Sequence, residues 1–149
     1  LSKFLRSTTL RTSARNQFRG QITKILKGGI NTEVELRLNE SSKIIATVTN
    51  ESVKQMGLKK GAYAIALIKS SWIILSTDRD ITTSARNRLE GTVNKIIKGK
   101  VNSEIQLNLG AEKRLSCILT NESVNSLKLR KRQTAYALFK ASSVILMSD

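Results

Sequence analysis

The sequence contains no histidine and no proline, and it has one cysteine among 149 residues. Without histidine or paired cysteines, the transition-metal sites that cluster these side chains are excluded. The single Cys117 also rules out an internal disulfide framework and fits a reducing compartment. Its apolar, strand-like surroundings predict a buried packing residue. Without proline, the turns depend on glycine, asparagine and serine.

Other absences narrow the class of function. No apolar run approaches the roughly 18 residues that a membrane-spanning helix needs, and no signal-peptide pattern is present. There is no paired-acid motif and no glycine-rich phosphate loop, so we expect a cytoplasmic protein that is not an enzyme. Aromatic residues make up only 4% of the chain. They form no alternating platform on which bases could stack.

Positive charge, in contrast, is abundant. Twenty-six Lys and Arg residues face 11 Asp and Glu residues, which gives a net charge of +15. The basic residues are spread along the whole chain and are not confined to one arm. This distribution fits an ordinary soluble surface, and it also fits attraction to an anion, either a nucleic acid or a small oxyanion.

The chain consists of two copies of one module. Residues 12–75 align with residues 83–146 without a gap, and about four positions in ten are identical, which is far above the background for unrelated segments. Modules of this size have marginal cores by themselves. We therefore expect each module to depend on its twin or on a second chain.

Each module is predicted to be all-β. Residues 33–38 and 104–109 alternate strictly between polar and apolar, which is typical of a strand with one solvated face, where the glutamates are expected to be exposed. In the first repeat, further strands are predicted over 20–25, 43–49, 62–69 and 72–75, with a short helix over 49–57. Five strands and one helix favour two tandem OB-like five-stranded barrels, each with one short helix.

The first of three repeated motifs is Ser-Ala-Arg-Asn, which precedes the first strand of each module as residues 13–16 and 84–87. An isolated arginine there would most simply be solvated, but its return with the same neighbours favours a function. Asn16 and Asn87 are alternatively structural, because asparagine can fix a turn through side-chain to backbone hydrogen bonds.

The second motif is Thr-Asn-Glu-Ser-Val, at residues 49–53 and 120–124. The simplest interpretation is a helix N-cap. A helix N-terminus also exposes unpaired amides and receives anions well, so the two roles are compatible.

The third motif is a lysine that closes an apolar strand, Lys69 before Ser70 and Lys140 before Ala141. A charged residue at this position is often only a solvated strand end. Its repetition again leaves a binding role open.

Taken in order, these motifs resemble the Mop domain, the molybdate-binding module of the TOBE superfamily. The matching segments are Ser-Ala-Arg-Asn with a glycine four residues later, Lys-Gly-x-(Ile/Val)-Asn-(Ser/Thr)-Glu-(Val/Ile), Thr-Asn-Glu-Ser-Val and Lys-(Ala/Ser)-Ser. The resemblance covers nearly all of both repeats. The tandem pair is similar to the molybdate-sensing C-terminal half of the molybdate-dependent transcriptional regulator, or alternatively to a di-Mop storage protein.

The resemblance implies molybdate or tungstate as the ligand, no organic cofactor, a homodimer, and anions held at interfaces between modules. Thr49 and Ser52 would reach the first site from a neighbouring module. Carried over by motif, the first site would use Ser13, Arg15, Thr49, Ser52, Lys69 and Ser70, and a possible second site would use Ser84, Arg86, Thr120, Ser123, Lys140 and Ala141. Ala141 lacks the hydroxyl of Ser70, so only its backbone amide could contribute.

The predicted division of the chain follows the repeats. Residues 1–11 would be a linker from a missing N-terminal DNA-binding domain, 12–76 the first Mop domain, 77–82 a short joint and 83–149 the second Mop domain. The nonmethionine start at Leu1 favours such a fragment of a regulator. A tandem OB-type nucleic-acid-binding module remains the less favoured alternative, because aromatic residues are few.

The residue types suit the ligand. Molybdate is a tetrahedral dianion whose four oxygens accept hydrogen bonds and donate none. Arginine, lysine, serine, threonine and helix-end amides supply donors only. Phosphate carries a proton near neutral pH and would also need an acceptor, which the motifs lack unless Glu51 or Glu122 turns inward.

Overall fold

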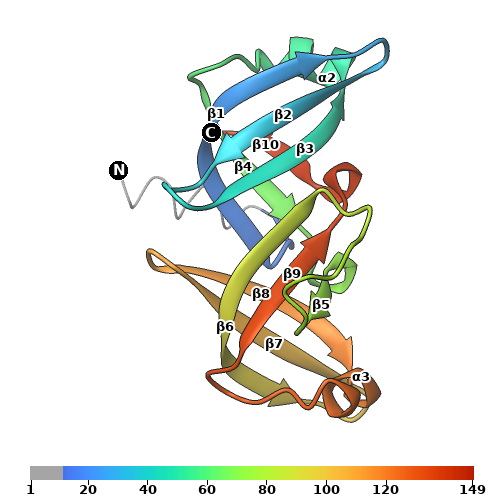
Figure 1. Ribbon diagram of the computed structural model, residues 1–149. Coiled ribbons are helices and arrows are strands. Elements are labelled where there is room, and N and C mark those ends of the chain that lie inside the picture. The colour runs from blue at the N-terminus through green and yellow to red at the C-terminus, as the bar shows by residue number, and fades with distance from the viewer. Residues whose placement is uncertain (1–11) are drawn as a thin grey trace. The chain divides into compact units, whose positions relative to one another are not determined.

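The computed structural model describes residues 12–149 of the chain, and the predicted linker over 1–11 lies outside the described residues. The chain divides into two compact units. Unit 1 contains residues 12–68 together with Ala141–Asp149, and unit 2 contains Lys69–Lys140. Figure 1 shows the strands that make up each unit.

Unit 1 is built around one antiparallel five-stranded sheet in the order β10-β4-β1-β2-β3. The helix α2 follows β3, and a single 3₁₀ turn, η2, precedes β10. The elements are β1 (Asn16–Lys27), β2 (Asn31–Arg37), β3 (Lys43–Thr49), α2 (Asn50–Met56), β4 (Tyr63–Ile68), η2 (Ala141–Ser143) and β10 (Ile145–Ser148).

Unit 2 repeats this plan with the sheet order β5-β9-β6-β7-β8. Its elements are η1 (Ser70–Trp72), β5 (Ile74–Ser76), β6 (Asn87–Lys98), β7 (Asn102–Gly110), β8 (Lys113–Thr120), α3 (Asn121–Ser126) and β9 (Thr134–Phe139). Two five-stranded sheets, each with one short α-helix, confirm the predicted all-β, OB-like class.

The sheets follow from the alternation in sequence. Along β2, Thr32, Val34 and Leu36 are buried while the residues between them are not, so one face of the strand builds the core. The equivalent β7 buries Ser103, Ile105 and Leu107 in the same way. β4 and β9, which read as continuous apolar runs, are buried on nearly every residue.

Not all of the strand glutamates are exposed as expected. Glu35 is half-buried on β2, where it accepts a hydrogen bond from Thr23 Oγ1 at 2.8 Å and lies 3.2 Å from Lys43 Nζ. The hydrogen bond from Thr23, together with the contact to Lys43, lowers the pKa of this carboxyl against the opposing effect of burial. The polar face of this strand is therefore a cross-strand network, not simply a solvated surface.

Cys117 is the buried packing residue that the sequence predicted. It lies on β8 with no exposed surface. Burial, helped by the Glu104 carboxylate, raises the pKa of its thiol to about 12, so the thiol stays protonated and unreactive near neutral pH.

A glycine is required where β1 bends. A Cβ on Gly20 would lie 2.7 Å from Arg37 O and 2.8 Å from Leu36 Cγ, so the side-chain-free backbone lets β2 approach. The register of the β1–β2 pair shifts just beyond it, between Ile22 and Lys24. The same register shift occurs in β6, between Val93 and Lys95. Both repeats therefore bend their first strand with a bulge at the equivalent position.

The last strand of each repeat is exchanged. β5 ends the first repeat, yet it pairs with β9 of the second. β10 ends the second repeat and pairs with β4 of the first. The compact units therefore do not coincide with the sequence repeats, because each contains the final strand of the other repeat. The domain boundaries at 12–76 and 83–149 stay a prediction.

The fifth predicted strand needs correction. Residues 72–75 were expected to be extended, but Ser70–Trp72 forms the 3₁₀ turn η1 and the strand runs over Ile74–Ser76. The turn is closed by a hydrogen bond from Trp72 N to Lys69 O at 3.0 Å. Small serines that readily form turns precede the apolar run, so the chain turns before it extends. No helix within residues 12–149 is long and apolar enough to cross a bilayer.

Candidate functional site

The asparagine of the entrance motif is structural. Asn16 is 1% exposed, and its Nδ2 donates to Ile68 O at 3.0 Å. Asn87 is 2% exposed at the equivalent position. Asn16 therefore fixes the start of a long strand against the end of its neighbour, the structural role that the sequence left open.

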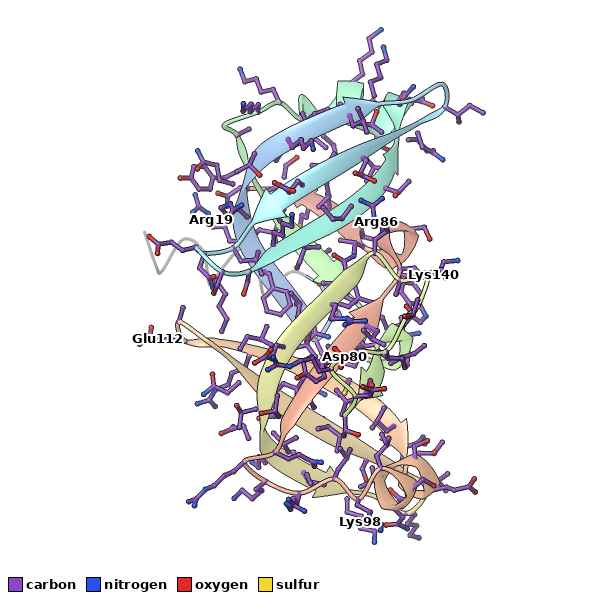
Figure 2. The ribbon with its side chains drawn as sticks, viewed as in Figure 1. Arg19, Asp80, Arg86, Lys98, Glu112 and Lys140 are labelled. Atoms are coloured by element: carbon purple, nitrogen blue, oxygen red, sulfur yellow. The ribbon has the colours of Figure 1, made fainter. Side chains whose placement is uncertain are left out.

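This pairing sets the position of the basic residues. Asn16 lies opposite Ile68 in the β1–β4 pair, and Asn87 lies opposite Phe139 in the β6–β9 pair. Arg86 directly precedes Asn87, and Lys140 directly follows Phe139, so both cations of unit 2 come to the same end of the two strands (Figure 2). The start of one strand and the end of its neighbour thus gather two positive charges at one place.

The exposure of the entrance and strand-end residues fits a role at the surface. Outside the helix caps, the side chains of the predicted sites that carry charge or a hydroxyl are exposed, with one exception at Ser70. The exposed residues are Ser13, Arg15, Lys69, Ser84, Arg86 and Lys140.

Ser70 is buried and its hydroxyl has no hydrogen-bond partner in the described part of the chain. It is 3% exposed and opens the turn η1. Burying an unsatisfied hydroxyl is unfavourable, so such a group calls for an explanation, which a ligand that accepts its hydrogen bond would provide. In the second repeat Ala141 takes this position, 5% exposed and without a hydroxyl.

Lys69, which precedes this turn, is held near an aromatic ring. Its Nζ lies 5.7 Å from the centroid of the Trp72 ring, within the range of a cation–π contact. Trp72 is the only tryptophan of the chain and is 47% exposed. It therefore provides a fluorescent reporter beside one predicted site and not the other, where Ser143 stands in its place.

The Thr-Asn-Glu-Ser motif forms a helix cap in both repeats. Thr49 Oγ1 accepts a hydrogen bond from Ser52 N at 3.1 Å and donates to Ser52 Oγ at 2.8 Å. Thr120 and Ser123 repeat both bonds, at 3.1 and 2.9 Å. Because the threonine hydroxyl donates its proton to the serine oxygen, the proton of each serine hydroxyl remains available to an acceptor.

The asparagine of the same motif has a role that the sequence analysis missed. Asn50 Nδ2 donates to Gly28 O at 3.0 Å, and its Oδ1 accepts from Thr32 Oγ1 at 2.5 Å. Asn121 makes the equivalent bonds to Gly99 O and Ser103 Oγ. The asparagine of the motif therefore anchors the turn between the first two strands of each repeat. The only sign of this role in the sequence is the Asn-(Thr/Ser) pair that both repeats carry after that turn.

The two units distribute the predicted site residues across the repeats. In unit 2, η1 packs against β8, the strand that ends at Thr120. The strand-end motif of the first repeat therefore shares a unit with the cap motif of the second. Reciprocally, η2 packs against β3, which ends at Thr49, in unit 1. The predicted first site combines Lys69 and Ser70 with Thr49 and Ser52, which belong to the other unit, so this grouping stays a prediction.

A hollow of about 480 Å³ marks the junction in unit 2. Glu122 lies on the rim as an exposed carboxylate, whereas Glu51 of the first repeat is bonded to Gln55 Nε2 at 3.3 Å. The hollow in unit 2 therefore has one carboxylate acceptor, Glu122, beside the hydroxyl groups of Thr120 and Ser123. The lining includes Ile73, Ile74 and Leu75 from the segment after η1, and Thr120, Ser123 and Leu127 from the end of β8 and α3.

Comparison with known families finds the TOBE domain twice, over residues 12–75 and 83–146. Similar proteins include the molybdenum transport protein ModE of Herbaspirillum seropedicae, which is 40% identical over 98% of this chain and 55% of its own length. The molybdenum-pterin-binding protein MopA of Rhodobacter capsulatus is 43% identical over 94% of this chain and 53% of its own. The chain thus spans about half the length of these curated relatives.

A solved structure matches the whole fold. The cytoplasmic molybdate-binding protein ModG, crystallised with molybdate bound, superposes with a TM-score of 0.89 at 38% identity. The match covers 93% of this chain and 99% of ModG. The exchanged strands and both barrels therefore lie within one known architecture.

Proposed function

We propose, since this chain belongs to the TOBE domain family, that it binds molybdate or tungstate through hydrogen-bond donors at the junctions of its modules. The observation that carries the proposal is the buried Ser70 hydroxyl without a partner in the described part of the chain. A tetrahedral oxyanion would accept its proton and that of neighbouring donors. Relatives named for molybdenum or molybdate support the identity of the anion.

Four donors of the proposed first site lie at the start of β1 and at the end of β4. Ser13 and Arg15 precede β1, and Lys69 and Ser70 follow β4. Two cations facing one dianion supply the charge-assisted hydrogen bonds that are stronger than neutral ones. Two such cations would repel each other without the anion, and a bound dianion would remove this penalty.

The helix cap completes the proposed site in one of two ways. Thr49 and Ser52 would come from a neighbouring module, as the sequence predicts, or Thr120 and Ser123 would serve, since η1 packs on the strand that leads to them. The proposed second site uses Ser84, Arg86 and Lys140, with the Ala141 amide in place of a hydroxyl and Thr120 and Ser123 as predicted. A homodimer would supply the neighbouring module in the first arrangement, whereas in the second the cap belongs to the same unit of the same chain as Ser70.

Two roles are open for a protein that binds this anion. We propose that the chain is the ligand-sensing part of a transcriptional regulator that contacts DNA through another domain, because curated relatives of about twice its length include ModE proteins described as transcriptional regulators. The alternative, a cytoplasmic molybdate store, is favoured by the match to nearly all of ModG. If regulation is right, molybdate will change the operator affinity of the full-length gene product; unchanged affinity favours storage.

Calorimetry with molybdate, tungstate and sulfate tests the binding itself. We expect binding of the first two at about micromolar Kd or tighter, weak binding of sulfate because it is smaller, and a concurrent change in Trp72 fluorescence. Lys69→Ala should weaken molybdate binding by about tenfold or more, since a hydrogen bond to a charged group is removed. Lys60→Ala removes an exposed lysine outside the proposed sites and serves as the control. Equal losses of affinity in the two variants would contradict the proposal.

The same titration separates the two helix caps. Ser52→Ala and Ser123→Ala each remove one hydroxyl but leave the capping bond from the backbone amide to the threonine oxygen in place. Disappearance of the Trp72 signal in Ser52→Ala assigns the first cap to the Ser70 site. Disappearance in Ser123→Ala assigns the second.

A further inference from the structure

One loop differs between the repeats in a way that the oxyanion sites do not explain. The loop after α3 carries the basic segment Lys128-Leu129-Arg130-Lys131-Arg132, here named the basic loop. The equivalent segment after α2 is Gly57-Leu58-Lys59-Lys60-Gly61. Two glycines of the first repeat are thus replaced by two cations in the second.

The backbone of the two loops is the same. In the first repeat Leu58 N donates to Val53 O, and Gly61 N donates to Ile22 O. In the second, Leu129 N donates to Val124 O at 3.2 Å and Arg132 N to Val93 O at 2.8 Å. The basic loop is fixed further by a bond from Arg130 N to Gln133 Oε1 at 3.1 Å, so its side chains project from an ordered frame.

The two positions at which a cation replaces a glycine are positions where the backbone conformation favours glycine. Gly57 and Gly61 have φ of 63° and 93°, in the left-handed region. Lys128 and Arg132 keep φ of 52° and 72°, although a side chain makes this conformation unfavourable. Backbone strain of this kind clusters at functional sites, which makes these two cations candidates for a function.

All four cations of the basic loop are exposed, and none has an ion-pair partner among residues 12–149. Lys131 and Arg132 line a hollow of about 270 Å³ together with Thr92, Asn94 and Asn108. Hydroxyl and amide groups can donate hydrogen bonds beside the two cations. This surface combines unpaired positive charge with neutral donors, which is the chemistry that contacts phosphate groups.

We propose that the basic loop of unit 2 binds the sugar–phosphate backbone of nucleic acid without reading its sequence. Several cations in sequence, at the spacing of neighbouring side chains, suit a polymer with regularly spaced charges better than one small ion. A membrane surface fits less well, because the only apolar residue of the loop, Leu129, is half-buried and not offered for insertion. The proposal does not depend on molybdate binding.

The proposed DNA binding is tested by fluorescence anisotropy. A labelled DNA duplex of about 20 base pairs is titrated at a series of salt concentrations. The double variant Lys128→Gly, Arg132→Gly restores the glycines of the first repeat. It should weaken DNA binding by about tenfold at low salt and lower the slope of log K against log salt by about 0.9 for each phosphate that is no longer neutralised. Its melting temperature should stay equal or rise, because the left-handed positions then hold glycine.

The matched control is Lys59→Ala, Lys60→Ala, which removes the same charge from the equivalent loop of the first repeat. A second variant, Arg130→Gln, Lys131→Gln, tests the remaining cations without touching the left-handed positions, and should also weaken DNA binding. The proposal holds if both basic-loop variants have reduced DNA affinity and the control does not. Equal reductions in the control, no DNA binding by the unmodified chain at low salt, or binding to vesicles of anionic lipid but not to DNA would overturn it.

Discussion

At the scale of single residues, Ser70 and Ala141 separate the two repeats. Both are buried at the start of a 3₁₀ turn, but only the serine brings a hydroxyl, and that hydroxyl is unsatisfied within the described residues. A buried polar group without a partner lowers stability and becomes favourable once a ligand accepts its proton. We therefore expect the two proposed anion sites to differ in affinity.

Ser70→Ala tests whether this hydroxyl is kept for a ligand. The variant should raise the free energy of unfolding of the empty protein by about 1 kcal/mol, because a buried donor without a partner is removed. It should also weaken molybdate binding at the site beside Trp72. Denaturant unfolding and fluorescence titration measure the two effects, and Ser71→Ala, an exposed neighbour, is the control. A variant that loses stability and keeps its affinity would show that the serine is structural.

The repeated asparagines and the repeated lysines have different roles at the residue scale. Asn16 and Asn50 belong to motifs that return in both repeats, yet each side chain is hydrogen-bonded to the backbone of a neighbouring strand or turn. Their repetition reflects the fold, whereas the repeated Lys69 and Lys140 are exposed at strand ends, where a ligand can reach them. Repetition alone does not distinguish these cases; burial and hydrogen-bond partners do.

At the scale of elements, the β7–β8 hairpin carries avoidable strain. Gly110 pairs with Lys113, so Ala111 and Glu112 form a two-residue loop. Both have positive φ, 51° and 63°, which is typical of a type I′ turn. This turn matches the twist of the strands but favours Asn-Gly over Ala-Glu at its two central positions.

The double variant Ala111→Asn, Glu112→Gly should therefore stabilise the protein by about 1 kcal/mol, since these residues adopt the left-handed region at lower cost. Thermal unfolding followed by circular dichroism measures the change. The control is Asn39→Ala, Glu40→Ala in the corresponding connection of the first repeat, where positive φ is not found. A lower melting temperature in the hairpin variant would argue against a turn of this type.

At the scale of the whole molecule, the exchange of β5 and β10 makes each barrel depend on both repeats. β10 closes the sheet of unit 1 on β4, and its end is tied by Asp149 Oδ2, which accepts from Arg19 Nε at 2.6 Å. Val144 and Leu146 of this segment are buried in the core. A single repeat therefore lacks one strand of the barrel that it begins.

Truncation after Lys140 removes η2 and β10 and should affect unit 1 alone. The amides of β4 that face β10 should exchange with solvent faster, because their partners and the buried Leu146 are gone. Hydrogen exchange measures this, with β9 of unit 2 as the internal control, since β9 keeps β5 and β6 as neighbours. Equal decreases of protection in β4 and β9 would mean that the units do not unfold separately.

The sequence by itself determined what depends on neighbouring residues. Strict alternation predicted β2 and β7, and the order Thr-Asn-Glu-Ser with a following glycine predicted the capped helix α2, because strand faces and helix caps are set within a few residues. The repeat indicated the family and the predicted site residues. It also marked Arg15, Lys69 and their equivalents as positive groups next to strand ends.

Only the tertiary structure decided which barrel each final strand closes. Ile74-Leu75 and Ile145-Leu146 are identical pairs that follow similar turns, and either could pair with the edge of β4 or of β9. Local sequence cannot decide between the two pairings, because each final strand would make nearly the same contacts with β4 as with β9. The structure exchanges the strands, and Ser70 is thereby buried in the unit that contains the cap of the other repeat.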